Sequence, residues 1–119
     1  MKVKDPIASL LPLSPAALHI LTAVAGEERH GYAIMQEVAR QSDGRYKLGP
    51  GTLYDNIEKL IDRGLIREVA RPSADDDPRR RYYQLTTFGR RVLSAEVTRL
   101  GSVLRAAKMR LATNDSSEA

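Results

Sequence analysis

The hydrophobic period of this sequence changes at Gly64, and no other feature constrains the fold as tightly. Before Gly64, apolar residues recur at the three- and four-residue spacing of an amphipathic helix in three successive stretches, at about residues 14–26, 27–44 and 50–63. After Gly64, apolar and polar residues alternate with a period of two, which is typical of half-buried strands. The chain is therefore expected to combine helices with a small sheet.

Capping and stop residues set the ends of the predicted helices. Ser14 is a preferred N-cap, Pro15 suits the first helical position, and Gly26 predicts a left-handed stop for the first helix. The second helix is expected to end near Gly44. Between the second and third helices, the short segment "RYKL" (45–48) predicts a small strand.

The two alternating stretches, "LIREVA" (65–70) and "RRRYYQL" (79–85), are joined by the polar segment "RPSADDDP" (71–78), which predicts a β-hairpin with a long loop. Three helices followed by a hairpin are typical of the winged helix-turn-helix arrangement, in which the hairpin is the wing. The expected fold class is therefore α+β and mainly α. An N-terminal arm (1–12) is expected to precede a DNA-binding domain (13–86).

Apolar residues in the last stretch are spaced 4, 3, 4, 3 and 4 residues apart, which is a heptad seam. Thr86 is a natural cap for a helix over 87–112, and the polar segment 113–119 is expected to be disordered. A seam of this length needs a partner helix, so we expect the helix to hold a homodimer together. The seam residues are Leu93, Val97, Leu100, Leu104, Ala107 and Leu111.

The outward side of the third helix is expected to read DNA, because this helix enters the major groove in winged helix-turn-helix proteins. Thr52, Asn56 and Lys59 lie on that side, near the N-terminal end. Asn56 is suited to adenine, and Lys59 to guanine or phosphate. Asp55 either accepts from a cytosine amine or forms an ion pair with Lys59 one turn later. The alternative is an ordinary solvated polar face.

The third helix opens with "GPGT" (49–52), in which two flexible residues flank a stiff one. The N-terminus of a helix binds anions well, and residues without bulk let a phosphate approach its amides. Gly51 is therefore expected to face the DNA backbone. A plain loop without a ligand is the alternative.

The predicted wing carries a second basic cluster, which follows an acidic triplet (75–77). One or two of its arginines are expected to reach phosphate or the minor groove. The alternative is a charge run that neutralises itself. Tyr32 and Tyr54, at the starts of the second and third helices, are placed to donate to phosphates. The arginines are Arg79, Arg80 and Arg81.

Composition excludes several other classes of function. The formal net charge of +4 is compatible with a nucleic-acid partner, and the lack of cysteine excludes thiolate metal sites and disulfides. His19 and His30 lie in different predicted helices without supporting ligands, so no metal, cofactor or catalytic set is expected and the chain is not expected to be an enzyme. Prolines interrupt the N-terminal apolar run, and no run approaches the ~20 residues that span a bilayer, so we expect a cytoplasmic protein.

Three segments together resemble the PadR family of bacterial transcriptional regulators. They are "HGYAIMQEV" (30–38), "GPGTLYDNIEKLIDRGLI" (49–66) and "RRRYYQLTTFG" (79–89). The resemblance extends over about Leu13 to Leu93, and the single helix after the wing is similar to the short branch of the family. It implies a homodimer, usually a repressor, that binds an inverted-repeat operator.

The resemblance also implies roles for individual residues. It makes a DNA-facing set of Tyr32, Thr52, Tyr54, Lys59 and Arg81. Some members of the family respond to phenolic acids or flat hydrophobic drugs near the dimer axis, which implies a small-molecule effector. This chain departs from the drug-binding members because it has no tryptophan and one phenylalanine, Phe88. The alternative function is a winged-helix module that binds another protein and not DNA.

Overall fold

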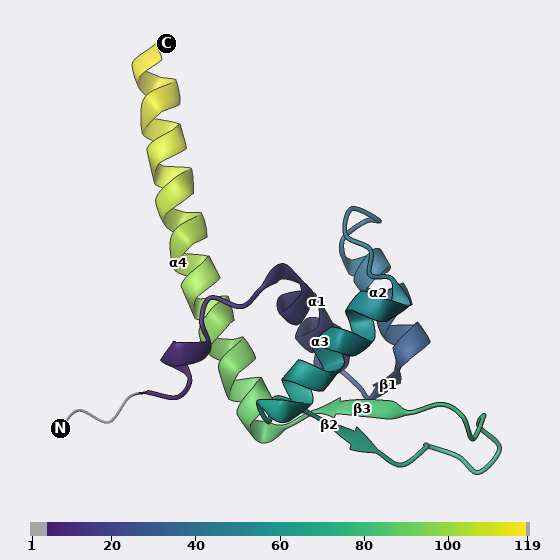
Figure 1. Cartoon of the computed structure of the whole chain (residues 1–119). Coiled ribbons are helices and arrows are strands. Elements are labelled where there is room, and N and C mark those ends of the chain that lie inside the picture. Colours follow the sequence, from purple (N-terminus) through teal and green to yellow (C-terminus); the bar gives the residue numbers. More distant parts are fainter. Residues whose placement is uncertain (1–4, 119) are drawn as a thin grey trace.

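The computed structural model describes residues 5–118, and the side chains of residues 5–113. A compact unit of short helices and a small sheet is followed by a long helix that extends away from it (Figure 1). This is the mainly helical α+β arrangement that the sequence predicts. The elements are η1 (Ala8–Leu10), α1 (Pro15–Ala25), β1 (Arg29–His30), α2 (Gly31–Gln41), α3 (Pro50–Asp62), β2 (Ile66–Val69), β3 (Tyr82–Leu85) and α4 (Thr87–Glu118).

The predicted start of α1 is confirmed and its predicted end is wrong. Ser14 Oγ accepts from the Ala17 amide at 3.1 Å, and Pro15 occupies the first helical position. Gly26, however, has φ −84°, which is not left-handed. Arginine side chains satisfy the last carbonyls of α1 instead, since Arg29 Nε donates to the Ala23 oxygen at 2.7 Å. Arg90 does the same for the carbonyl of Ala25 at 3.1 Å.

The stops of the next two helices are confirmed. Gly44, after α2, and Gly64, after α3, both have φ +75°. The Gly44 amide donates to the carbonyl oxygen of Ala39 at 2.7 Å, which closes the end of α2 in the way a left-handed glycine allows. The Leu65 amide closes α3 through the carbonyl of Leu60 at 2.9 Å.

The sheet has the strand order β1-β3-β2, with both neighbours antiparallel to β3. The hairpin of β2 and β3 is confirmed, but the strand predicted at 45–48 is wrong. That segment folds back on α2 because the Ser42 hydroxyl accepts from the Tyr46 amide at 3.0 Å, and the Tyr46 ring stacks on His19. The third strand is Arg29–His30, which pairs with Tyr82 and Tyr83.

The core forms where α1 meets α2, α3, β3 and the first turns of α4. Burial does not alternate strictly along the hairpin, because Leu65 and Ile66 are both buried, as are Tyr82 and Tyr83. The short strands are therefore covered on more than one side. The other large, fully buried side chains are Ile20, Leu21, Val24, Ile34, Val38, Leu53, Leu60, Val92 and Glu96.

The last helix begins as predicted and runs further than predicted. Thr86 Oγ1 accepts from the Gly89 amide at 2.9 Å, so this residue caps α4. The helix continues to Glu118 instead of ending near Ala112, and the segment 113–118 is helical where disorder was expected. No glycine or proline interrupts these residues, and Ala119 lies outside the described residues.

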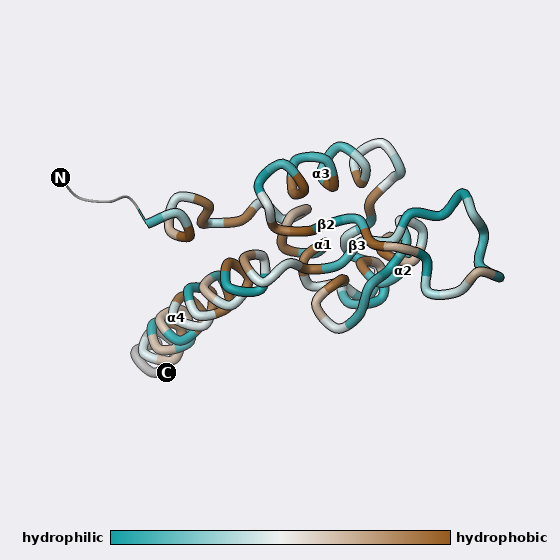
Figure 2. Tube along the Cα trace, turned by 90° about the horizontal axis from the view of Figure 1, so that it is seen from below, coloured by the Kyte–Doolittle hydropathy of each residue, from teal (hydrophilic) through white to brown (hydrophobic). Residues whose placement is uncertain are grey.

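Most of the heptad seam lies on the surface of the single chain. Val97 is 59%, Leu104 is 55% and Leu111 is 62% exposed. Leu93, nearer to the start of α4, is partly buried against the core. Hydrophobic and hydrophilic segments alternate along α4 (Figure 2), as expected for a helix with one apolar side.

Candidate nucleic-acid interface

The N-terminus of α3 is bare. Gly49 is its N-cap, with φ −80° and no side-chain cap. Gly49 and Gly51 both have negative φ, and a Cβ at either would meet no described atom within 4 Å. Neither the backbone conformation nor internal packing therefore requires glycine at these two positions. What the glycines provide is an open approach to the first amides of α3.

The face of α3 opposite the core is polar, and Figure 2 shows it as a hydrophilic outer edge. Thr52, Asp55 and Lys59 are exposed there. Asn56 is half-buried, and its side-chain amide donates to the Thr52 carbonyl at 2.8 Å. Among residues 5–113 no ion pair joins Asp55 to Lys59, so the structure does not show the intrahelical pair that was one of two expectations for Asp55.

A cleft of about 380 Å³ lies between the start of α2, the start of α3 and the wing. It brings together five of the residues that the sequence predicts to face DNA. No carboxylate lines it, so its charged lining is positive. The lining residues are His30, Gly31, Tyr32, Tyr54, Arg79, Arg80, Arg81 and Tyr83.

Within this cleft, the ring of Tyr54 lies against the first residue of α2. A Cβ at Gly31 would lie 2.3 Å from the Tyr54 hydroxyl oxygen and 2.9 Å from the ring carbon that carries it. Gly31 is therefore needed for Tyr54 to keep its position. Sequence reasoning missed this contact between the second and third helices, although glycine at a helix start was a signal for a close approach.

His30 caps α2, a role that sequence reasoning did not assign. Its Nδ1 accepts from the Ala33 amide at 3.1 Å, and its ring meets Tyr82 edge-on at 5.3 Å between centroids. Burial and then the charge of Arg80 lower the pKa of His30, against an opposing effect of Asp76. The imidazole is thus neutral at pH 7, which the cap requires because Nδ1 must keep its lone pair.

Two of the wing arginines are held by aspartates of the same loop. Arg79 contacts Asp77 through two nitrogens at 3.2 Å each, and Arg80 Nη1 lies 3.0 Å from Asp76 Oδ1. The Arg79 guanidinium lowers the pKa of Asp77. Arg81 is freer, since it is 72% exposed and its Nε lies 3.9 Å from Glu68.

The pKa of Asp76 is lowered by the Tyr82 hydroxyl and by Arg80. Asp76 and Asp77 therefore carry full negative charge at neutral pH beside the wing arginines. The charge run neutralises itself in part, as the alternative expectation held, and Arg81 keeps the most accessible positive charge of the three.

A second hollow, of about 350 Å³, lies on the other flank of α3, where it meets the start of α1. Asn56, Lys59 and Arg63 line this hollow, together with Ser14 and Tyr46. The predicted residues of α3 are thus divided: Tyr54 lies on the wing flank, whereas Asn56 and Lys59 lie on the α1 flank. In the described chain, Thr52 and Asp55 line neither hollow, so they occupy the ridge between them.

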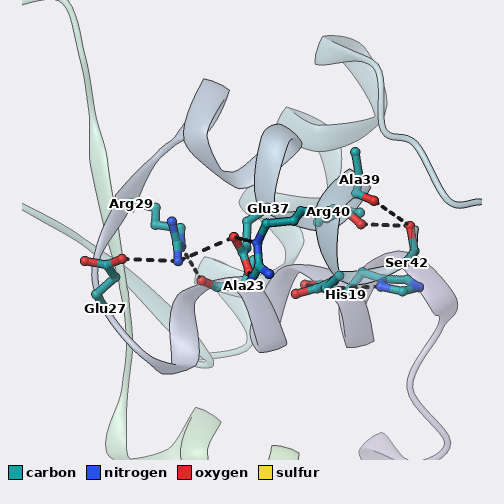
Figure 3. Close-up of polar contacts among 10 residues, drawn as sticks. His19, Ala23, Glu27, Arg29, Glu37, Ala39, Arg40 and Ser42 are labelled. Atoms are coloured by element: carbon teal, nitrogen blue, oxygen red, sulfur yellow. Dashed lines mark hydrogen bonds and ion pairs between the residues drawn. The ribbon is translucent and has the colours of Figure 1, made fainter. Parts of the chain in front are cut away.

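The helices that carry these residues are fixed by a buried polar network (Figure 3). Arg29 donates to the carbonyl of Ala23 in α1 and lies 3.7 Å from Glu37 in α2 and 3.2 Å from Glu27. Gln41 Nε2 donates to the His19 carbonyl at 2.9 Å. These contacts join α1 to α2 across the core and hold the base of the cleft. Periodicity alone does not predict such long-range pairs.

Two further observations concern the part of the chain that the structure describes. No group of three or more histidine, cysteine, aspartate or glutamate side chains in residues 5–118 is arranged to hold a metal ion. None of the described helices is long and apolar enough to cross a membrane.

Comparison with known proteins places this geometry among transcriptional regulators. Residues 20–95 match the family described as "Transcriptional regulator PadR-like family". The chain is 35% identical over 88 residues to the transcriptional regulator Rv3488 of Mycobacterium tuberculosis, covering 74% of this chain and 78% of that protein.

Solved structures show the same fold. A PadR family transcription regulator from hypervirulent Clostridium difficile superposes with a TM-score of 0.67 at 22% identity, covering 82% of this chain and 99% of that one. A PadR-like transcriptional regulator from Bacillus cereus superposes with a TM-score of 0.68 at 20% identity, covering 91% and 97%.

Proposed function

The chain belongs to the PadR-like family of transcriptional regulators, and from this premise we propose that it is a homodimeric repressor that binds an inverted-repeat DNA operator. The family is one of regulators and not of enzymes. The observation that carries the proposal is the positively lined cleft beside α3, where Tyr32, Tyr54 and the wing arginines meet. A helix with an open N-terminus and cations on one side of it suits a major groove bounded by phosphates.

In the proposed complex, α3 enters the major groove through the ridge of Thr52 and Asp55. The cleft takes one phosphate backbone, with Arg81 and the hydroxyls of Tyr32 and Tyr54 as donors. Lys59, on the opposite flank, serves the other backbone. Arg79 and Arg80 must exchange their aspartate partners for phosphate, so we expect them to contribute less than Arg81.

The dimer part of the proposal rests on the apolar seam of α4. Leu100, Leu104 and Leu111 are exposed in the single chain, and a second copy of α4 would cover them. A twofold symmetric dimer presents two α3 helices related by the same axis, so its operator has inverted half-sites. By the family resemblance, a small-molecule effector near this axis releases the repressor, and the regulator acts in the cytoplasm.

Fluorescence anisotropy with operator fragments selected from genomic DNA tests the proposal. We expect affinity that falls steeply with salt and a specific site that survives competitor DNA. Lys59→Ala and Arg81→Ala should each weaken binding and reduce the salt slope by about one. A flat salt dependence without any selected sequence would instead favour a protein-interaction module.

The open start of α3 has its own matched test. Gly51→Leu should weaken DNA binding at least about tenfold while folding is unchanged, because a Cβ has room in the free protein but obstructs a phosphate. Gly26→Leu is the control, since Gly26 also has negative φ and free space but lines neither hollow. Equal DNA affinity of the two variants would contradict this docking.

A further inference from the structure

Asp55 places a carboxylate at the centre of the surface that is proposed to meet DNA. It is exposed, and among the hollows beside α3 it lines neither the wing-side cleft nor the α1-side hollow. Its neighbour on the ridge is Thr52, one turn towards the N-terminus of α3. A side chain here meets the floor of the groove and not its phosphate walls.

The carboxylate has no stabilising partner in the fold. In residues 5–113 Asp55 forms no ion pair and accepts no side-chain hydrogen bond. It also lies beyond the first turn of α3, which holds no acidic residue, so it gains little from the helix dipole. Close to DNA it is repelled by phosphates. A negative charge at this point therefore lowers affinity for DNA in general.

A carboxylate offers hydrogen-bond acceptors and no donor. In the major groove its partners are exocyclic amino groups, and cytosine presents N4 as its donor, whereas adenine places the acceptor N7 beside its N6 amine. A carboxylate therefore fits cytosine better than adenine. The nearby amide of Asn56 is already donated to the Thr52 carbonyl and points along α3.

We propose that Asp55 is a specificity-determining residue that accepts a hydrogen bond from the N4 amine of a cytosine in each operator half-site. This inference rests on the proposed DNA-binding function and adds to it the base that one residue selects. The repulsion from phosphates is offset where the amine is present and is not offset elsewhere, so Asp55 separates operator from other DNA.

Selection from a randomised DNA library, followed by anisotropy on single-base-pair variants at fixed salt, tests the inference. For the wild-type protein, replacing the selected cytosine should weaken binding roughly 5-fold to 100-fold. Asp55→Ala should remove this penalty at that position alone. Asp55→Asn should move the preference from cytosine to adenine, because an amide pairs with N6 and N7 of adenine.

Asp62→Asn is the matched control, because it removes the same charge from an exposed residue at the far end of α3. It should raise affinity for all sequences by a similar factor and keep the cytosine preference. If Asp55→Ala selects the same sequence with the same penalties, the inference is wrong while the proposed function stands. If the wild-type protein selects no sequence at all, both are wrong.

Discussion

The two halves of α4 belong to different environments although the helix between them is unbroken. In the first half, Gly89 and Val92 are buried in the domain, and Glu96 is 1% exposed. In the second half, Leu104 and Leu111 are more than half exposed. The first half is thus part of the core of its own chain, whereas the second is suited to a partner. One helix carries rigidity from the DNA-binding domain to the proposed dimer contact.

The sharpest way to break this comparison is to place a charge in the seam. Leu104→Asp should raise the dimer dissociation constant at least about a thousandfold, because two carboxylates would be buried together on the twofold axis. The fold of each chain should survive, since Leu104 is 55% exposed in the single chain. Sedimentation equilibrium measures the change.

Ser102→Asp is the control for that measurement. Ser102 is exposed, and it lies half a turn from Leu104 around α4, on the side away from the seam. It should leave the dimer intact. Equal dissociation by both variants, or a monomeric wild-type protein at micromolar concentration, would show that the seam does not hold two chains together.

The same substitution in the two halves should have opposite effects on stability. A Cβ at Gly89 would lie 2.0 Å from the Leu65 carbonyl oxygen, so Gly89→Ala should lower the free energy of unfolding by about 3 kcal/mol or more. At Gly101 the nearest atom to a Cβ is 3.7 Å away, so Gly101→Ala should raise it by about 0.5–1 kcal/mol. Urea unfolding at one protein concentration measures both, and destabilisation by Gly101→Ala would mean that the second half is not free.

A smaller effect concerns the buried carboxylate in the first half. Glu96 Oε2 accepts from the Leu13 amide at 2.7 Å and its other oxygen accepts from Arg99, so it ties the N-terminal segment to α4. Glu96→Gln should lower the free energy of unfolding by about 1–3 kcal/mol at pH 7. The hydrogen bond from Arg99 lowers the pKa of Glu96.

The sign of the pH effect follows from that direction. Because the folded pKa lies below the unfolded value of about 4.3, the contribution of Glu96 is complete above that pH and is lost as the pH falls through the folded pKa. The stability difference between wild type and Glu96→Gln should therefore shrink below about pH 4. A difference that stays constant down to pH 2 would contradict the charged role of Glu96.

The parts of the fold that depend on local rules were predictable from the sequence. The caps at Ser14 and Thr86 and the left-handed glycines at 44 and 64 act within one turn of chain, and each is present. Gly26 was wrong because Arg29 and Arg90 reach the end of α1 from elsewhere. The two-residue strand β1 was missed because its pairing with β3 spans more than fifty residues and leaves no periodic signal.

The candidate site was predictable by residue type but not by arrangement. Patterns along the sequence selected Tyr54, Lys59 and Arg81, yet they did not separate the two flanks of α3 on which Tyr54 and Lys59 lie. The charge of the wing was visible, whereas its pairing was left as an alternative. Which arginine binds which aspartate depends on how the loop between β2 and β3 folds back, and side-chain geometry decides it.

The contact between Gly31 and Tyr54 has an evolutionary consequence. Any side chain at position 31 would displace the tyrosine ring, whereas a smaller residue at position 54 would remove the obstacle. Substitutions at these positions are therefore expected to be accepted in a fixed order during divergence, first at 54 and then at 31. Among relatives of this chain, glycine at 31 should vary freely only where position 54 has already lost its large aromatic ring.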